Sequence, residues 1–145
     1  LKIIIMLYPK KVKFRKWHTM RHNPNRARID TRGAKVSFGS HGLKAVSAGR
    51  IRSPQIEAAR RVITREMSKT GKFWIRIFPD KPYTAKPAEV GMGKGKGDPA
   101  GYEFIVWPGR VLFEVDGLAE PAARAALRQA GSKLPIKTRV VARQH

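Results

Sequence analysis

The segment from residue 10 to residue 32 most narrowly limits how this chain can fold. It carries nine Lys and Arg residues against one acid, Asp30, and its apolar residues follow neither a helical nor an alternating period. Like charges this dense repel one another and keep such a segment disordered in isolation. We therefore predict a basic N-terminal arm over residues 1–33 and a single folded domain over residues 34–145.

An excess of positive charge extends over the whole chain and indicates the class of partner. With 31 Lys and Arg against 10 Asp and Glu, the formal net charge is +21, and a compact fold with that charge repels itself unless an anionic partner neutralises it. A nucleic acid is the expected partner, because solubility alone needs a net charge of only about 2 to 8. No apolar run approaches the roughly 20 residues that span a bilayer, so we predict no membrane partner.

Aromatic residues are interleaved with the cations of the arm. Phe14 and Trp17 stand among lysines and arginines, a mixture that suits phosphate contacts combined with stacking on unpaired bases. In the alternative interpretation, Trp17 only anchors the arm to the domain.

From residue 34 onward the pattern is that of an α+β domain. Short alternating or β-branched runs predict strands at 36–38, 43–46, 73–78, 102–107, 110–115 and 136–142. We expect a turn at 39–42, a buried strand at 73–78, and a hairpin whose turn is Pro108-Gly109. Helical patterns at 53–69 and 120–130 complete a two-layer fold, with two helices packed on a mainly antiparallel sheet. The second helix has Ala123, Ala126, Leu127 and Ala130 on one side, and these small side chains permit close packing on the sheet.

The first predicted helix begins at Ser53-Pro54, since a Ser side chain can cap free amides and Pro at the first helical position loses no hydrogen bond. Its apolar residues share one stripe, which we expect to pack on the sheet: Ile56, Ala59, Ile63 and Met67. Its main cations lie off that stripe: Arg60, Arg61 and Arg65. One face of this helix should therefore be buried and another basic.

Residues 79–101 contain four prolines and several glycines, so we predict one long Gly/Pro-rich loop rather than a regular element. Its glycine cluster at 91–97 matches neither the P-loop nor the dinucleotide-binding pattern, because Lys96 stands where each requires Gly. A flexible backbone that can approach phosphates closely remains, with Lys94 and Lys96 supplying charge. The alternative is an ordinary flexible linker.

No catalytic or metal site is predicted. The chain has no cysteine, which removes thiol nucleophiles and Cys-containing zinc sites. His18 and His22 form the only close histidine pair and lack acidic neighbours that would orient them. Glu114 and Asp116 fall on one side of a predicted strand near its end, where solvated charges are expected. We therefore predict no cofactor, no metal and no enzymatic activity.

The residues expected to bind RNA come from the arm, the first helix, the strands and the loop. They are Lys10, Lys11, Lys13, Arg15, Lys16, Trp17, Arg21, Arg26, Arg28, Arg32, Lys44, Arg50, Arg60, Arg61, Arg65, Lys81, Lys94 and Lys96. Contacts from such cations to phosphates position a protein on its RNA.

Eight short blocks follow one another in the order of a known family. They are MLYPK (6–10), KFRK (13–16), SFG (37–39), GLKA (42–45), QIEAARR (55–61), FPDKP (78–82), MGKGKG (92–97) and KLPIKT (133–138). Together they closely resemble bacterial-type large-subunit ribosomal protein sixteen. The resemblance implies an α+β domain bound to large-subunit rRNA beside neighbouring ribosomal proteins, without homo-oligomers. It further implies contact with tRNA at the aminoacyl site and a loop directed toward the peptidyl-transferase centre.

Three features depart from the family pattern. Residues 1–5 precede its usual start, the segment 22–32 is longer than in bacterial members, and Gly91 stands where the family usually has Arg. The first two favour a mitochondrial ribosome over a bacterial or plastid one, with Leu1 left by removal of a transit peptide. The third removes one guanidinium that would be directed at phosphate.

Two other functions stay open from the sequence. A free-standing RNA chaperone or regulatory RNA-binding protein with the same fold would sediment apart from large subunits in low salt. An RNA-modifying enzyme would need a general base or a cofactor site, and the sequence presents neither.

Overall fold

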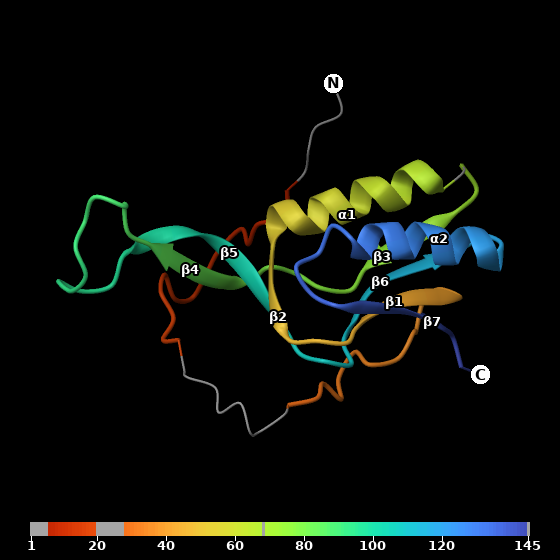
Figure 1. Ribbon diagram of the computed structural model, residues 1–145, viewed down its shortest axis with the longest axis horizontal. Coiled ribbons are helices and arrows are strands. Elements are labelled where there is room, and N and C mark those ends of the chain that lie inside the picture. Colours follow the sequence, from red (N-terminus) through yellow and green to blue (C-terminus); the bar gives the residue numbers. More distant parts are fainter. Residues whose placement is uncertain (1–5, 20–27, 68, 145) are drawn as a thin grey trace.

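A computed structural model describes residues 6–19, 28–67 and 69–144. Its elements are β1 (His41–Ala45), β2 (Gly49–Arg52), α1 (Ser53–Glu66), β3 (Lys72–Ile75), β4 (Lys81–Ala85), β5 (Asp98–Val106), β6 (Val111–Asp116), α2 (Glu120–Gly131) and β7 (Thr138–Ala142). The predicted α+β class is confirmed: both helices cover one side of an antiparallel sheet of order β3-β6-β1-β7 (Figure 1).

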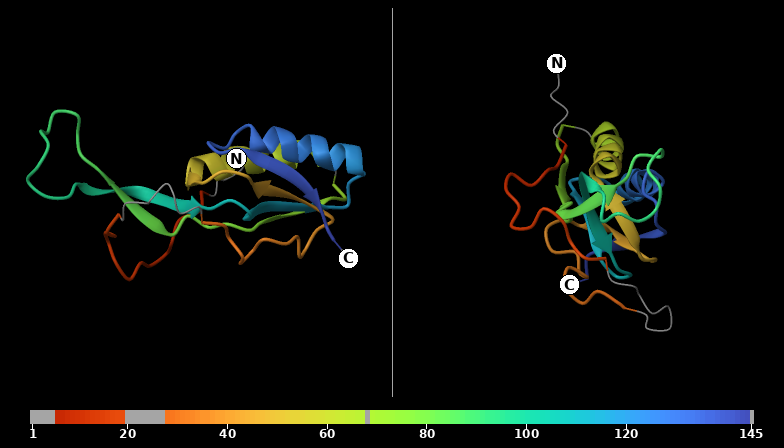
Figure 2. Two further views of the ribbon diagram at one scale, coloured as in Figure 1. Left: turned by 60° about the horizontal axis from the view of Figure 1, so that its bottom comes forward. Right: turned by 90° about the vertical axis from the view of Figure 1, so that its left-hand side faces the viewer.

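A second antiparallel sheet, of order β2-β5-β4, was not predicted. Its β4–β5 hairpin projects away from the body of the protein (Figure 1 and the left view of Figure 2). The predicted loop at 79–101 is thus wrong in extent, because β4 and β5 occupy both of its ends and leave only residues 86–97 between them. The sheet tolerates Pro82 because β4 is an edge strand, and Pro99 because it lies beyond the last β2 pair, Arg52 with Glu103.

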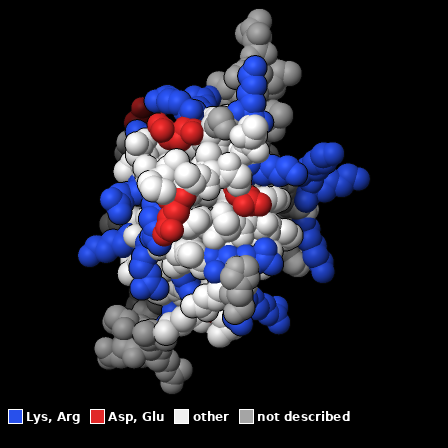
Figure 3. Space-filling view, turned by 90° about the vertical axis from the view of Figure 1, so that its right-hand side faces the viewer, with Lys and Arg blue, Asp and Glu red and all other residues white. Residues whose placement is uncertain are grey.

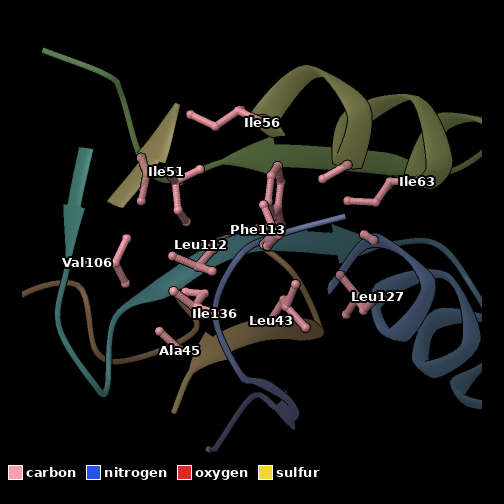
Figure 4. Packing of buried hydrophobic residues seen from close by; sticks show 14 of the residues in the cluster. Leu43, Ala45, Ile51, Ile56, Ile63, Val106, Leu112, Phe113, Leu127 and Ile136 are labelled. Atoms are coloured by element: carbon pink, nitrogen blue, oxygen red, sulfur yellow. The ribbon is translucent and has the colours of Figure 1, made fainter. Parts of the chain in front are cut away.

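The core lies between the helices and the four-stranded sheet, with Phe113 near its centre (Figure 4). The predicted stripe of each helix is confirmed, with buried residues Ile56, Ala59 and Ile63 in α1 and Ala123, Ala126, Leu127 and Ala130 in α2. Met67, just past α1, is only partly buried against this core. The packed face of α1 fixes which of its cations point outward.

A β-bulge brings two successive residues of β6 into the core. Leu43 pairs with Phe113 and the next residue, Lys44, pairs with Val111, so Leu112 has no partner on β1. A bulge of this kind re-aims the side chains around it, and both Leu112 and Phe113 are fully buried. The regular alternation predicted for 110–115 is therefore interrupted.

The predicted β5–β6 hairpin is wrong, because the two strands belong to different sheets. Gly109 takes a left-handed backbone, with φ of +97°, and its N–H donates to the Ala45 carbonyl at 2.8 Å. The Ala45 N–H in turn donates to the Arg110 carbonyl at 2.8 Å. The turn at Pro108-Gly109 is thus held by the end of β1, and it passes the chain from one sheet to the other.

Several predicted ends shift for identifiable reasons. Residues 36–38 form no strand, and β1 already begins at His41, inside the predicted turn.

The N-cap of α1 is Arg52, whose N–H donates to Gln55 Oε1 at 2.9 Å, while the Oγ of Ser53 is buried without a hydrogen-bond partner. The helix then ends before its predicted limit at residue 69. The run at 73–78 is only half-buried over its strand portion, because β3 is an edge strand.

Glu114 corrects a further expectation, since its side chain is fully buried rather than solvated. Its carboxylate accepts hydrogen bonds from the N–H of Ser37 at 2.5 Å, the N–H of Phe38 at 3.3 Å and the guanidinium of Arg76 at 3.2 Å. The amides of residues 37 and 38 are therefore occupied by this carboxylate, which explains why the segment forms no strand. Asp116, by contrast, is exposed as predicted.

Candidate nucleic-acid interface

Residues 6–19 of the arm run beside the base of the β4–β5 hairpin (Figures 1 and 2). Residues 6–19 form neither helix nor strand. The Tyr8 ring meets the Tyr102 ring of β5 edge to face, with centroids 6.3 Å apart, and the Lys96 amine donates to the Trp17 carbonyl. The arm and the loop, which were predicted separately, thus meet on one side of the hairpin.

The arm cations described by the structure are exposed: Lys10, Lys11, Lys13, Arg15, Lys16, Arg28 and Arg32. Within the described residues none of them forms an ion pair with a carboxylate. Their charge is therefore available to a polyanion. The predicted site residues Arg21 and Arg26, together with His22 of the histidine pair, lie outside the described residues.

A hollow of about 400 Å³ lies between the arm and the β2-β5-β4 sheet, and we call it the arm–sheet hollow. It brings together four of the predicted site residues: Trp17, Arg28, Arg50 and Lys81. Trp107, which was not predicted, also lines it, and the Arg28 guanidinium lies 5.2 Å from the centroid of the Trp107 indole. Trp17 is 42% exposed, so it contacts the domain while keeping a surface for a partner.

A buried carboxylate lies beside this hollow. Glu103 of β5 is 2% exposed, and its Oε1 lies 3.6 Å from Arg50 and 3.8 Å from Lys81. Lys81 is itself buried, so its amine is held inside the hairpin base rather than presented on the open surface. Lys44, another predicted site residue, is half-buried in β1.

The cations of α1 differ in how freely they can bind a partner. Arg60 makes two hydrogen bonds to Glu57, of 2.8 and 2.5 Å, while Arg61 lies 3.5 Å from the same carboxylate and Arg65 is exposed. The hydrogen bonds from Arg60 hold the pKa of the Glu57 carboxyl below its ordinary value. That pair therefore stabilises the fold above the ordinary carboxyl pKa and loses this contribution as the pH falls through the lowered one.

A family comparison decides what kind of protein carries these surfaces. The family model described as ribosomal protein L16p/L10e matches residues 9–141. The chain belongs to this family. The resemblance in the sequence blocks is thereby confirmed, and this L16p/L10e member is a structural, non-enzymatic protein of the large ribosomal subunit. It associates in the ribosome with ribosomal RNA and with other ribosomal proteins.

Substituting Arg61 should separate RNA binding from folding in this L16p/L10e member. Because Arg60 remains bound to Glu57, we expect Arg61→Ala to change the free energy of unfolding by less than about 0.5 kcal/mol. Affinity for large-subunit rRNA should fall, and the slope of log affinity against log salt concentration should become shallower by about 1. Urea denaturation and rRNA titration measure the two effects. Arg60→Ala is the contrasting variant, since it removes the closest partner of Glu57. If Arg61→Ala unfolded the protein instead, the assignment of Arg61 to the outward face of α1 would be contradicted.

Several arginines of this L16p/L10e member that are not among the predicted site residues lie in defined surroundings. Three stack on aromatic rings, with Arg52 over Tyr83, Arg76 over Phe38 and Arg110 over Phe104. Three more line a second hollow, of about 280 Å³, between α2 and β7: Arg124, Arg128 and Arg139. The first two stand four residues apart on one helix face, a signal that the sequence did contain. Figure 3 shows Lys and Arg around the rim of the face opposite the hairpin.

Among the residues that the structure describes, no group of three or more His, Cys, Asp or Glu side chains could hold a metal ion. In the same part of the chain, neither helix is long and apolar enough to cross a membrane.

Proposed function

We propose that this large-subunit protein binds large-subunit rRNA through the arm, the arm–sheet hollow and the outward cations of α1, and that its hairpin loop contacts tRNA near the aminoacyl site and the peptidyl-transferase centre. The observation that carries the proposal is the hydrogen bond from Lys96 to the Trp17 carbonyl. It joins the two most basic appendages of the chain into one surface. Phosphate backbones recognise such continuous positive surfaces without regard to sequence.

The geometry of the loop supports its role as a contact element. Gly93, Lys94 and Gly95 all have positive φ, of 94°, 59° and 92°, and a Cβ added at either glycine would meet nothing within 4 Å. The tip therefore stands free of the body, and Met92 beside it is fully exposed. The Lys86 amine donates to the Gly93 carbonyl and closes the loop on itself, so Lys94 is presented on a defined turn.

We assign the ribosome in question to the mitochondrion. The support is the resemblance to the bacterial family pattern, relative to which the segment 22–32 is longer. The sequence of the encoded precursor tests this assignment, because a nuclear-encoded mitochondrial member is made with an N-terminal transit peptide.

Removing the loop charges should impair function and leave the fold intact. In the variant Lys94→Ala/Lys96→Ala we expect large subunits to assemble, because the loop packs little apolar surface, and the free energy of unfolding to change by less than about 0.5 kcal/mol. Aminoacyl-site tRNA binding and peptide-bond formation by purified subunits should both decrease.

The matched control removes two exposed lysines from the body, in the variant Lys133→Ala/Lys137→Ala. It changes the net charge equally and should leave tRNA binding near the level of the unmodified subunit. Normal tRNA binding and peptide-bond formation in the loop variant would mean that the loop is passive, and the assignment of Lys94 and Lys96 would be withdrawn.

A further inference from the structure

We propose that the arm–sheet hollow binds a single unpaired nucleotide of ribosomal RNA, with its base stacked beside Trp17 and Arg28 and its phosphate near Arg50. This inference rests on the proposed function, because it names the part of the RNA that one region of the interface takes. It assigns a specific ligand to a region that would otherwise supply only general charge.

The size of the hollow suits one nucleotide. Its volume of about 400 Å³ lies within the range of roughly 300 to 1,000 Å³ found for small-molecule sites. Its lining is partly apolar, with Ile105 and Val106 at the end of β5 and Ala48 just before β2. A flat base fills such a space better than a paired helix could, since the base pairs of a duplex stay stacked inside it.

The chemistry of the lining combines planar groups with cations. The Arg28 guanidinium already lies over the Trp107 indole, and bases stack on guanidinium planes as well as on aromatic rings. A base beside Arg28 would extend that stack. Trp17 approaches from the arm, and its main chain is tied to the loop through Lys96, so the tryptophan is held near the hollow rather than left to move with the free arm.

The electrostatics favour an anionic occupant. Arg28, Arg50 and Lys81 line the hollow without any acidic residue among the lining side chains. The buried Glu103 beside them is close enough to pair with Arg50 and Lys81, and a single carboxylate neutralises only one of the three cations. The remaining positive charge repels the basic segments common in RNA-binding proteins and attracts a phosphate.

Titration of large-subunit rRNA with the full-length chain tests the stacking. Trp17→Leu keeps an apolar side chain but removes the ring, so affinity should fall by about 5- to 150-fold, the range for loss of one stacked base. The slope of affinity against salt should stay unchanged, because no phosphate contact is lost. Trp17→Phe should restore most of the affinity.

The matched control is Phe14→Leu, because Phe14 is an exposed aromatic residue of the same arm that does not line the hollow. It should lower affinity much less than Trp17→Leu. Equal losses for the two variants would show stacking along the arm in general and would overturn the proposal. An unchanged affinity for Trp17→Leu, with normal binding by the unmodified chain, would overturn the hollow alone and leave the proposed function standing.

Ultraviolet crosslinking gives a second measurement that a purely structural role of Trp17 would not produce. After irradiation of the complex and complete nuclease digestion, mass spectrometry should find a mononucleotide attached to a peptide containing Trp17, Arg28 or Trp107. Adducts confined to other peptides would overturn the proposal, as would a protein segment crosslinked at these residues in whole subunits. Failure of the unmodified chain to bind large-subunit rRNA at all would reject the proposed function, and the hollow with it.

Discussion

Affinity of the full-length chain for large-subunit rRNA is expected to fall by about 1,000- to 100,000-fold as monovalent salt rises from about 50 to 200 mM. Each cation that neutralises a phosphate releases a condensed counterion, and a protein with about six to ten such contacts loses affinity on this scale. The arm alone presents seven described cations without an ion-pair partner among the described residues: Lys10, Lys11, Lys13, Arg15, Lys16, Arg28 and Arg32. Titrations at several salt concentrations measure the slope of log affinity against log salt concentration.

The slope of log affinity against log salt concentration also measures how many arm cations contact phosphates. Changing Lys10, Lys11 and Lys13 to Gln should make the slope shallower by about 2 to 3, since each contact contributes roughly 0.7 to 0.9. Replacing the same three lysines by Arg keeps the charge and should leave the slope unchanged. A flat salt profile for the unmodified chain would contradict the electrostatic account.

The second large effect concerns stability, and it centres on Glu114. Replacing Glu114 by Ala leaves the Arg76 guanidinium without its carboxylate and two main-chain N–H groups without their acceptor. Removal of one partner from a buried ion pair costs about 3 to 5 kcal/mol, so the free energy of unfolding should fall by about 3 kcal/mol. Urea denaturation of the full-length chain, read at its midpoint and slope, measures the change.

Two variants bracket this result. Glu114→Gln keeps one carbonyl oxygen as an acceptor and should be destabilised less than Glu114→Ala. Asp116→Ala removes an exposed carboxylate from the same strand and should change the unfolding free energy by less than about 0.5 kcal/mol. If Glu114→Ala were as mild as Asp116→Ala, the carboxylate would not be what holds residues 37 and 38 on the sheet.

The helices could be predicted from the sequence because their signals are local. The spacing of Ile56, Ala59 and Ile63 identified the buried face of α1, and the alanines of α2 with Leu127 identified its own. The ends of the helices were misplaced. Arg52 and not Ser53 is the N-cap of α1, and the Arg52 N–H donates a hydrogen bond to the side-chain oxygen of Gln55. Such a bond competes with others of similar energy.

The sheets were predicted less well because their pairing depends on partners far along the chain. Runs on either side of Pro108-Gly109 have the pattern of a hairpin, yet the N–H of Val111 donates to Gly33 and the carbonyl of Arg110 accepts from Ala45. The burial of Glu114 depends on Ser37, 77 residues away. No pattern within a short window contains that information.

In the candidate interface, too, the individual residues could be predicted from the sequence, whereas their arrangement in space could not. The sequence identified Trp17, Arg28, Arg50 and Lys81 one by one, because cations, and an aromatic residue interleaved with them, are typical of RNA-binding surfaces. That these four line one hollow follows from the path of the arm across the β2-β5-β4 sheet. Trp107 gave no such signal, since a tryptophan at the end of an apolar strand is equally typical of a core.

The connection between β5 and β6 has a mechanical consequence for the hairpin. From residue 98 the chain leaves the loop as one strand, passes the turn that β1 holds at Gly109, and continues as β6 between β3 and β1. Extended backbone stretches little, and this path contains no slack segment. A pull on β5 is therefore carried along the main chain to β6 in the interior of the four-stranded sheet, so that the hairpin is anchored in the core and not attached through a flexible linker.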